Sequence, residues 1–588
     1  MYGSKLLIAV QCIVVCLSLS SANINAHDRS SKMTNQSIGH LFSEKQVSSP
    51  SEYFLNRNKA LNLIRTKNWQ EANVILMSLT DQYPDDGDTW YLLGLSYFKT
   101  EQWQNAVDAY KKTLAIGTVL SGIPDGSAPS NDIMIKIAQS YAELNRPTQA
   151  INWINKALDA RYDGKHLLAK DEHFNKIHHL NEFKKAIGTF LPNNMTRDQS
   201  WQYDLNYLMS EIKRLHVNPF HNVSKQHFER MVTNIKNDIP KLNDKEIIFR
   251  FMELVALLGN GHNFIIPTFN EKGSFNQLPV QFYKFSDGIF IVNADNEYKS
   301  LIGHKLIEIA GMPIEDALTK VNRVNARDNE MQHLWLGPHY LALPEVLKGL
   351  GIVRNSSEVT LLLENSDGKR ITITPTIRAM TFNGFPKLPA LKGHDLVHNL
   401  KVDKQYWFTH LSHYSSVYMQ YNYVHNDPTL SFKAFNKVLR KEISKKGVEH
   451  LIIDLRHNAG GDGSKYPPLL KTIAQFEALK PQGKVFVIIG RNTFSAAHNL
   501  LVDIERISNA IIVGEPSGSR PNALSEAGWF KLPYSKTLGI VSSQYHQASK
   551  AEDHRIWIAP HVPVSLSSGQ YFSGIDPALE AIFTIINQ

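Results

Sequence analysis

Three apolar runs between residues 448 and 522 constrain the fold most, because each leads into a turn that contains glycine. The runs are Leu451–Leu455, Val485–Ile489 and Ala510–Val513. Their content of Ile, Val and Leu is typical of buried strands. Between the second and third runs, residues 496–507 carry apolar side chains at helical spacing. Strands that alternate with helices predict an α/β layered domain.

A serine stands where the second run meets the helical segment. Ser495 would there lie at the end of a rigid strand and at the positively polarised N-terminus of a helix. The N–H of Ala496 can point at an oxyanion. The pair Gly460-Gly461, after the first run, lets a second N–H approach the same point because no Cβ intervenes. Alone, Ser495 would be interpreted as a helix N-cap, but the glycine turn favours a nucleophile beside an oxyanion hole.

Residues 52–160 repeat with a fixed period. Trp69 and Trp103 are 34 residues apart, and Ala72 and Ala106 have the same separation. Large and small residues recur at the offsets of the tetratricopeptide repeat (TPR), and a third copy follows a ten-residue insertion placed in residues 117–130. Such helix pairs bury their apolar faces only by stacking. Two roles stay open, a concave peptide-binding surface and a spacer that orients the rest of the chain.

Residues from about 200 to 588 resemble the C-terminal-processing (tail-specific) serine protease family. The resemblance rests on Leu455–Gly461, Phe494–Ala497 and Gly514–Ser517, which occur in order at the family's spacing. It implies a crotonase- or ClpP-like α/β catalytic core, Ser495 as the nucleophile on peptide bonds, and no cofactor.

The two branches of this family use different general bases, and this chain matches only one of them at the corresponding position. The processing branch uses a lysine 25 residues after the serine, where this chain has Arg520. A guanidinium cannot accept a proton at physiological pH. The branch that resembles the tricorn core uses a histidine from an upstream loop, and Gly259–Asn263 matches that loop, with Gly261 where the pattern has serine. We therefore predict His262 as the base. His498, on the same helical face as Ser495, is the alternative.

The remaining site residues are less constrained. The family carries its acid near Ile556–Pro560, so Asp553 is our first prediction for the acid and Glu552 our second; a solvated turn is the alternative. Arg520 is predicted to bind a substrate carboxylate, because a guanidinium is always charged and can bind in a bidentate manner.

The N-terminal residues have the pattern of a targeting sequence. Lys5 precedes an apolar stretch that ends in small residues near Ala22 and Ala26, as in a secretory signal peptide; an uncleaved membrane anchor is the alternative. Both cysteines lie inside this segment, so the mature chain would have no disulfide and no thiol chemistry. No later stretch is long and apolar enough to span a bilayer. We expect a periplasmic or extracellular protein.

Composition and motifs exclude other classes. The net charge of +8 over 588 residues is too weak a bias to indicate nucleic-acid binding. The 24 histidines show no ligand spacing, so no metal site is predicted. Residues 301–311 resemble the central part of a PDZ-like domain.

Together these observations predict a multidomain α plus α/β protein, an exported serine-type peptidase that hydrolyses polypeptides through an acyl-enzyme. Its repeats would bind a protein or peptide. The alternative is a catalytically degenerate peptidase fold that only captures peptides. The predicted order is a signal peptide over 1–26, a linker over 27–50, TPR helices as an α-solenoid over 51–195, a helical segment with the histidine loop over 200–270, a small PDZ-like β-rich region over 271–380 and a serine peptidase α/β domain over 381–588.

Overall fold

The computed structural model describes residues 49–118, 121–123, 126–127, 130–268, 271–381, 384–390 and 401–588. The predicted signal peptide and nearly all of the predicted linker lie outside the described residues, so both stay predictions. The chain divides into two compact units, Met1–Ala128 and Pro129–Gln588. No helix of the described ranges combines the length and the apolar character that crossing a bilayer requires.

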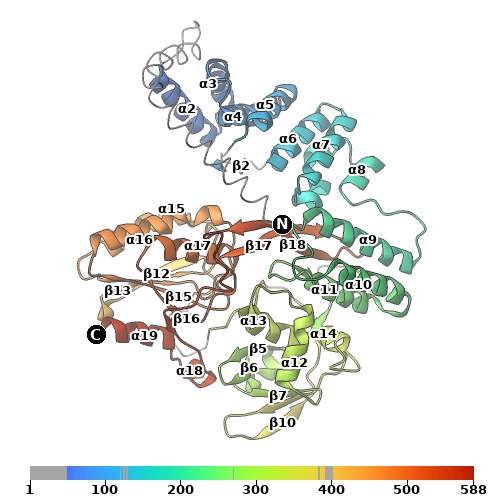
Figure 1. The fold of residues 1–588 in the computed structure, drawn as a ribbon, viewed down its shortest axis with the longest axis vertical. Coiled ribbons are helices and arrows are strands. Elements are labelled where there is room, and N and C mark those ends of the chain that lie inside the picture. Colours follow the sequence, from blue (N-terminus) through green and yellow to red (C-terminus); the bar gives the residue numbers. More distant parts are fainter. Residues whose placement is uncertain are drawn as a thin grey trace, which may run out of the picture. The chain divides into compact units, whose positions relative to one another are not determined.

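The first unit consists of two helix pairs and a short hairpin (Figure 1). The helices begin where the repeat predicts, since Trp69 and Trp103 are the first residues of the second helix in each pair. Gly94 lets the second pair pack closely, because a Cβ on it would lie 2.7 Å from the ring of Tyr110. The elements are α2 (Pro50–Arg65), α3 (Trp69–Gln82), α4 (Gly87–Lys99), α5 (Trp103–Ile116), β1 (Ser121–Ile123) and β2 (Gly126–Ser127).

The second unit begins with helices. A third helix pair follows the first unit, and the predicted insertion lies between Ile116 and Ser130. The helical segment expected over residues 200–270 contains three α-helices. The elements are α6 (Ser130–Glu143), α7 (Pro147–Asp159), η1 (Gly164–Lys170), η2 (Glu172–Phe174), α8 (Asn181–Ala186), α9 (Arg197–Leu215), α10 (Lys225–Asp238), η3 (Ile239–Lys241) and α11 (Asp244–Ala256).

The middle of the second unit is rich in strands. One sheet has the order β10-β9-β7-β6-β5, with β8 paired to β7, and β4 pairs with β11. That this region is PDZ-like stays a prediction. The elements are β4 (Asn276–Gln277), β5 (Val280–Phe285), β6 (Gly288–Ala294), η4 (Asn296–Leu301), β7 (Lys305–Ile309), β8 (Met312–Pro313), α12 (Ile314–Lys320), η5 (Val321–Val324), α13 (Glu330–Leu341), α14 (Pro344–Gly349), β9 (Leu361–Glu364), β10 (Arg370–Ile373) and β11 (Arg378–Ala379).

The predicted α/β layers are formed by a sheet of order β12-β13-β14-β15-β16-β19, parallel from β13 onward. Leu451 and Ile453 pack against α15, α16 and α17, whereas Ile452 between them packs toward α19 on the other face (Figure 1). Cover on both faces explains why these strands are apolar throughout. The elements are β12 (Tyr406–Leu411), η7 (Ser412–Tyr414), β13 (Ser416–Tyr421), α15 (Phe432–Ile443), β14 (His450–Asp454), η8 (Gly463–Lys465), α16 (Pro467–Leu479), β15 (Lys484–Ile489), α17 (Ser495–Ile507), β16 (Ile511–Gly514), β19 (Val562–Pro563), α18 (Ser568–Phe572) and α19 (Pro577–Ile586).

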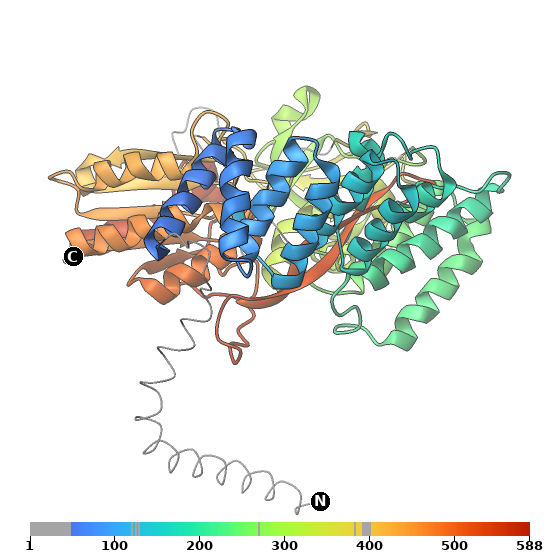
Figure 2. The ribbon, with the colours of Figure 1, turned by 90° about the horizontal axis from the view of Figure 1, so that it is seen from above.

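A long hairpin connects this sheet to the helices that precede it. β17 (Asn522–Lys531) and β18 (Leu538–Gln547) are antiparallel, and β18 also pairs with β3 (Phe264–Ile266). Figure 2 shows the hairpin running from the α/β layers toward α9 to α11. Since β3 begins two residues after His262, this sheet fixes the histidine loop to the C-terminal part of the chain.

Candidate active site

Ser495 lies at a sharp turn between β15 and α17. It is the first residue of α17, and its φ of 52° places it in the left-handed region that residues other than glycine seldom adopt. The N–H of Phe494 donates to the carbonyl of Asn458 at 3.1 Å, which fixes this turn to the loop after β14. A strained backbone held by its surroundings is typical of functional positions.

The glycine turn after β14 packs directly against the serine. A Cβ on Gly460, whose φ is 104°, would lie 2.7 Å from the Cβ of Ser495 and 3.0 Å from the backbone nitrogen of Ala496. The N–H of Gly460 donates to Oδ1 of Asn458 at 3.0 Å, so Gly460 supplies space and not the predicted donor. The N–H groups of Gly461 and Ala496 donate to no group in the described part of the chain. Both donors therefore remain unpaired within these residues.

The structure brings Ser495 and His262 together. Nε2 of His262 lies 3.1 Å from Oγ of Ser495, although the two residues are 233 positions apart. The imidazole is 7% exposed and stacks on Phe494, with ring centroids 4.6 Å apart. This is the geometry of a nucleophile beside its base.

Three neighbours of His262 in this loop each have a partner in a distant part of the chain. Asn263 accepts the N–H of Ser542 on β18 at 2.9 Å, and Asn260 accepts the hydroxyl of the same serine. Gly261 lies against Gln332, because a Cβ on it would come within 2.1 Å of that amide nitrogen. A serine at position 261 would therefore displace Gln332.

Burial sets the protonation state of His262. It lowers the pKa of His262 to about 4; the charge of Glu526 opposes this shift and that of His546 adds to it. The imidazole is therefore neutral at pH 7 and can accept the serine proton.

Two residues on β17 that the sequence reasoning did not name lie at this histidine. Oγ of Ser525 is 3.5 Å from Nδ1 and 3.4 Å from Nε2 of His262. Glu526 has a φ of 61°, and its carboxylate lies 3.4 Å from Nε2 of His546. The only sequence signal was a polar Ser-Glu pair next to an apolar strand end, without a motif.

The predicted acids lie elsewhere. Asp553 pairs with Arg555 at 2.8 Å, and this arginine also pairs with Glu505 at 2.7 Å. Glu552 is in an exposed turn. Among the residues described, no hydrogen bond or ion pair joins either carboxylate to His262. The carboxylate whose charge raises the pKa of His262 is that of Glu526.

The other two side chains singled out from the sequence are also away from the serine hydroxyl. Arg520 donates from Nε to the carbonyl of Asp328 at 2.7 Å and lines a separate cavity of about 430 Å³ with Arg323 and Arg327. His498, the alternative base, is buried, and neither of its ring nitrogens has a hydrogen-bond partner within the described ranges.

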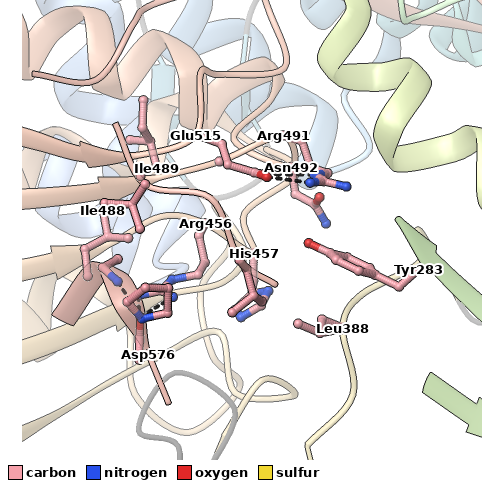
Figure 3. Close-up of a pocket in the computed structure, with 16 residues that line it drawn as sticks. Tyr283, Leu388, Arg456, His457, Ile488, Ile489, Arg491, Asn492, Glu515 and Asp576 are labelled. Atoms are coloured by element: carbon pink, nitrogen blue, oxygen red, sulfur yellow. Dashed lines mark hydrogen bonds and ion pairs between the residues drawn. The ribbon is translucent and has the colours of Figure 1, made fainter. Parts of the chain in front are cut away.

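A second cavity of about 70 Å³ is lined by residues 488–492, which lead from β15 toward Ser495 (Figure 3). On its wall, Arg491 pairs with Glu515 of the third motif and donates to the carbonyl of Lys284 at 2.7 Å. Arg456 pairs with Asp576 at 3.0 Å on the opposite side. Arg491 thus connects the serine turn to β5, and Arg456 connects the loop after β14 to the start of α19. The pairing of Glu515 with Arg491 gives the third motif a structural role.

In the ranges that the structure describes, no group of three or more His, Cys, Asp or Glu side chains is arranged to hold a metal ion.

Comparisons with known proteins agree with the sequence motifs. The tetratricopeptide repeat family model matches residues 88–115, which are α4 and α5, so the predicted repeat is confirmed. No curated protein matches the sequence.

The chain is similar to several solved structures. Mature CPAF complexed with lactacystin shares 14% identity over 66% of this chain and 98% of its own, with a TM-score of 0.49. The photosystem II D1 C-terminal processing protease shares 12% over 67% of this chain and 98% of its own, at 0.33. Tricorn protease shares 13% over 66% of this chain and 37% of its own, at 0.32. The second and third of these structures are named as proteases, and this chain has in addition the TPR match at residues 88–115.

Proposed function

We propose that the chain is an exported serine-type peptidase with Ser495 as nucleophile and His262 as general base. The observation that carries this proposal is the 3.1 Å contact between Nε2 and Oγ at a strand-to-helix turn. The buried neutral imidazole and the free N–H groups beside the serine supply the other two parts of acyl-transfer chemistry.

The reaction follows from these contacts. Oγ of Ser495 attacks the scissile carbonyl while its proton moves to Nε2 of His262. The N–H groups of Ala496 and Gly461 stabilise the negative oxygen of the tetrahedral intermediate. His262 then gives the proton to the leaving amine, which breaks the peptide bond and leaves an acyl-enzyme. Water, deprotonated by the same histidine, hydrolyses the ester.

The charge that develops on His262 needs a partner, and Glu526 is our candidate. Its carboxylate already favours the protonated imidazole. Oγ of Ser525, the residue before it, lies 3.5 Å from Nδ1 of His262 and would hold the ring. In this proposal the hydroxyl that the tricorn pattern places before the histidine is supplied from β17.

Labelling with a fluorophosphonate tests the function. We expect wild-type protein to acquire one phosphonyl group on Ser495 and Ser495→Ala to acquire none. Hydrolysis of an unstructured polypeptide should be lost in the same variant.

A folded wild-type protein that is not labelled would favour the alternative, a peptide-binding protein on a degenerate peptidase fold. The observation for this alternative is that Glu526 is shared with His546 and its side chain is 47% exposed.

The TPR helices are proposed to bind a protein partner or the polypeptide substrate. We also propose that the sheet from β5 to β10 is PDZ-like and that the α/β layers are crotonase- or ClpP-like. Its support is the sequence pattern of each region.

A further inference from the structure

One buried carboxylate contacts both loops of the candidate active site. Asp328, 4% exposed, lies between η5 and α13, outside every motif. Its Oδ1 accepts the N–H of Gly261 at 3.0 Å, and its Oδ2 accepts the hydroxyl of Ser519 at 3.0 Å. Gly261 directly precedes the base, and Ser519 lies in the loop after β16.

The second contact continues to the nucleophile. The same Oγ of Ser519 lies 3.5 Å from the backbone nitrogen of Ser495. A chain of contacts therefore runs from the residue before His262, through the Asp328 carboxylate and the Ser519 hydroxyl, to the backbone of Ser495.

The segment that carries this carboxylate is itself held at several points. Arg520 donates to the carbonyl of Asp328 at 2.7 Å, and the backbone N–H of Asp328 donates to the side-chain oxygen of Gln332. The side-chain amide of Asn329 donates to the carbonyls of Ser517 at 3.1 Å and of Ile556 at 2.8 Å. Position 328 is thus fixed relative to the α/β layers.

Burying an ionised carboxylate at this position costs free energy of folding. Burial raises the pKa of Asp328 to about 6, even though two donors point at it. No ion pair with its carboxylate occurs among the described residues. The charge of nearby Arg520 opposes this rise without forming an ion pair with the carboxylate. A buried charge that no ion pair offsets contributes poorly to stability, so the contacts at its two ends indicate another reason for its presence.

We propose that Asp328 is a positioning residue, which holds the His262 loop in register with Ser495 so that Nε2 stays within hydrogen-bond distance of Oγ. This inference rests on the proposed peptidase function. Small displacements of a base reduce rates strongly, about 100-fold for 1 Å.

Asp204 offers a matched control. It is also fully buried, accepts two backbone N–H groups, from Tyr534 at 2.7 Å and Ser535 at 2.8 Å, and has its pKa raised by burial to about 6. Among the described residues, no hydrogen bond joins its side chain to the serine or histidine loops. Asp204→Ala removes a similar buried carboxylate without touching the site.

The test measures two quantities in folded protein, the second-order rate of fluorophosphonate labelling and amide hydrogen exchange in residues 257–263. In Asp328→Ala we expect labelling to slow by about 10- to 100-fold and exchange in the loop to become faster. Asp328→Asn, which keeps an acceptor for Gly261, should recover part of the rate. Asp204→Ala should change neither quantity.

Ser519→Ala separates the two contacts. It should slow labelling less than Asp328→Ala, and the double variant should be no slower than Asp328→Ala alone. Labelling of Asp328→Ala at the wild-type rate, or unchanged loop exchange, would overturn the inference. If wild-type protein is not labelled at all, the peptidase function fails, and loop exchange alone still decides whether Asp328 holds the histidine loop.

Discussion

The protonation state of His262 is a consequence of where its ring lies. The side chain is almost fully buried against Phe494, and burial lowers its pKa to about 4. The base is therefore available over the whole neutral range, but the imidazolium that forms in the transition state is poorly solvated. A nearby negative charge then matters more to the rate than to the availability of the base.

This argument predicts the pH profile of Glu526→Gln. In wild-type protein the labelling rate should rise with pH through about 4, as His262 loses its proton, and then stay level. Since Glu526 raises this pKa, its removal should move the rise to lower pH and also reduce the level rate, by about tenfold. Asp553→Asn is the control and should leave the profile unchanged. A profile altered by Asp553→Asn and not by Glu526→Gln would restore Asp553 as the acid.

At the residue scale, the sequence predicted what short motifs encode. Ser495 and His262 stand in recognisable loops, and the structure places them together. Ser525, Glu526 and Asp328 were missed because their roles depend on which strand or turn folds against the histidine loop, and no local pattern marks them.

At the scale of elements, close packing of helix pairs depends on small residues at defined places. Gly94 on α4 faces the ring of Tyr110 on α5 at a distance that leaves no room for a side chain. The 34-residue period predicted these helices well, because each repeat encodes its own helix pair. The strands β17 and β18 were not predicted, because their sequence is mixed in polarity and their pairing with β3 joins positions far apart.

Gly94→Val tests the packing. We expect it to reduce the free energy of unfolding of the first unit by about 1–3 kcal/mol, through overpacking against Tyr110. Lys112→Val, at an exposed position of α5, is the control and should cost only a few tenths of a kcal/mol, about the difference in helix propensity. Thermal unfolding followed by circular dichroism measures both. Equal losses in the two variants would contradict the packing argument.

At the scale of the whole molecule, the proposed catalytic machinery comes from three separated parts of the second unit. The loop after α11 supplies His262, the segment before α13 supplies Asp328, and the loops after β14, β15 and β16 supply the serine and its surroundings. Fold class could be predicted because strand and helix periods are local. The assembly of these parts could not, because it depends on the β17-β18-β3 sheet and on buried polar contacts between distant segments.

The most direct measurement compares two buried histidines in the labelling of Ser495. His262 contacts the serine hydroxyl, whereas His498 lies one turn along α17, and its ring nitrogens have no hydrogen-bond partner in the described part of the chain. Replacement of His262 by Ala should slow labelling of folded protein by roughly 1,000-fold or more, and His498→Ala should leave the rate close to that of wild type. Undiminished labelling in His262→Ala, or its loss only in His498→Ala, would contradict the proposed role of the 3.1 Å pair.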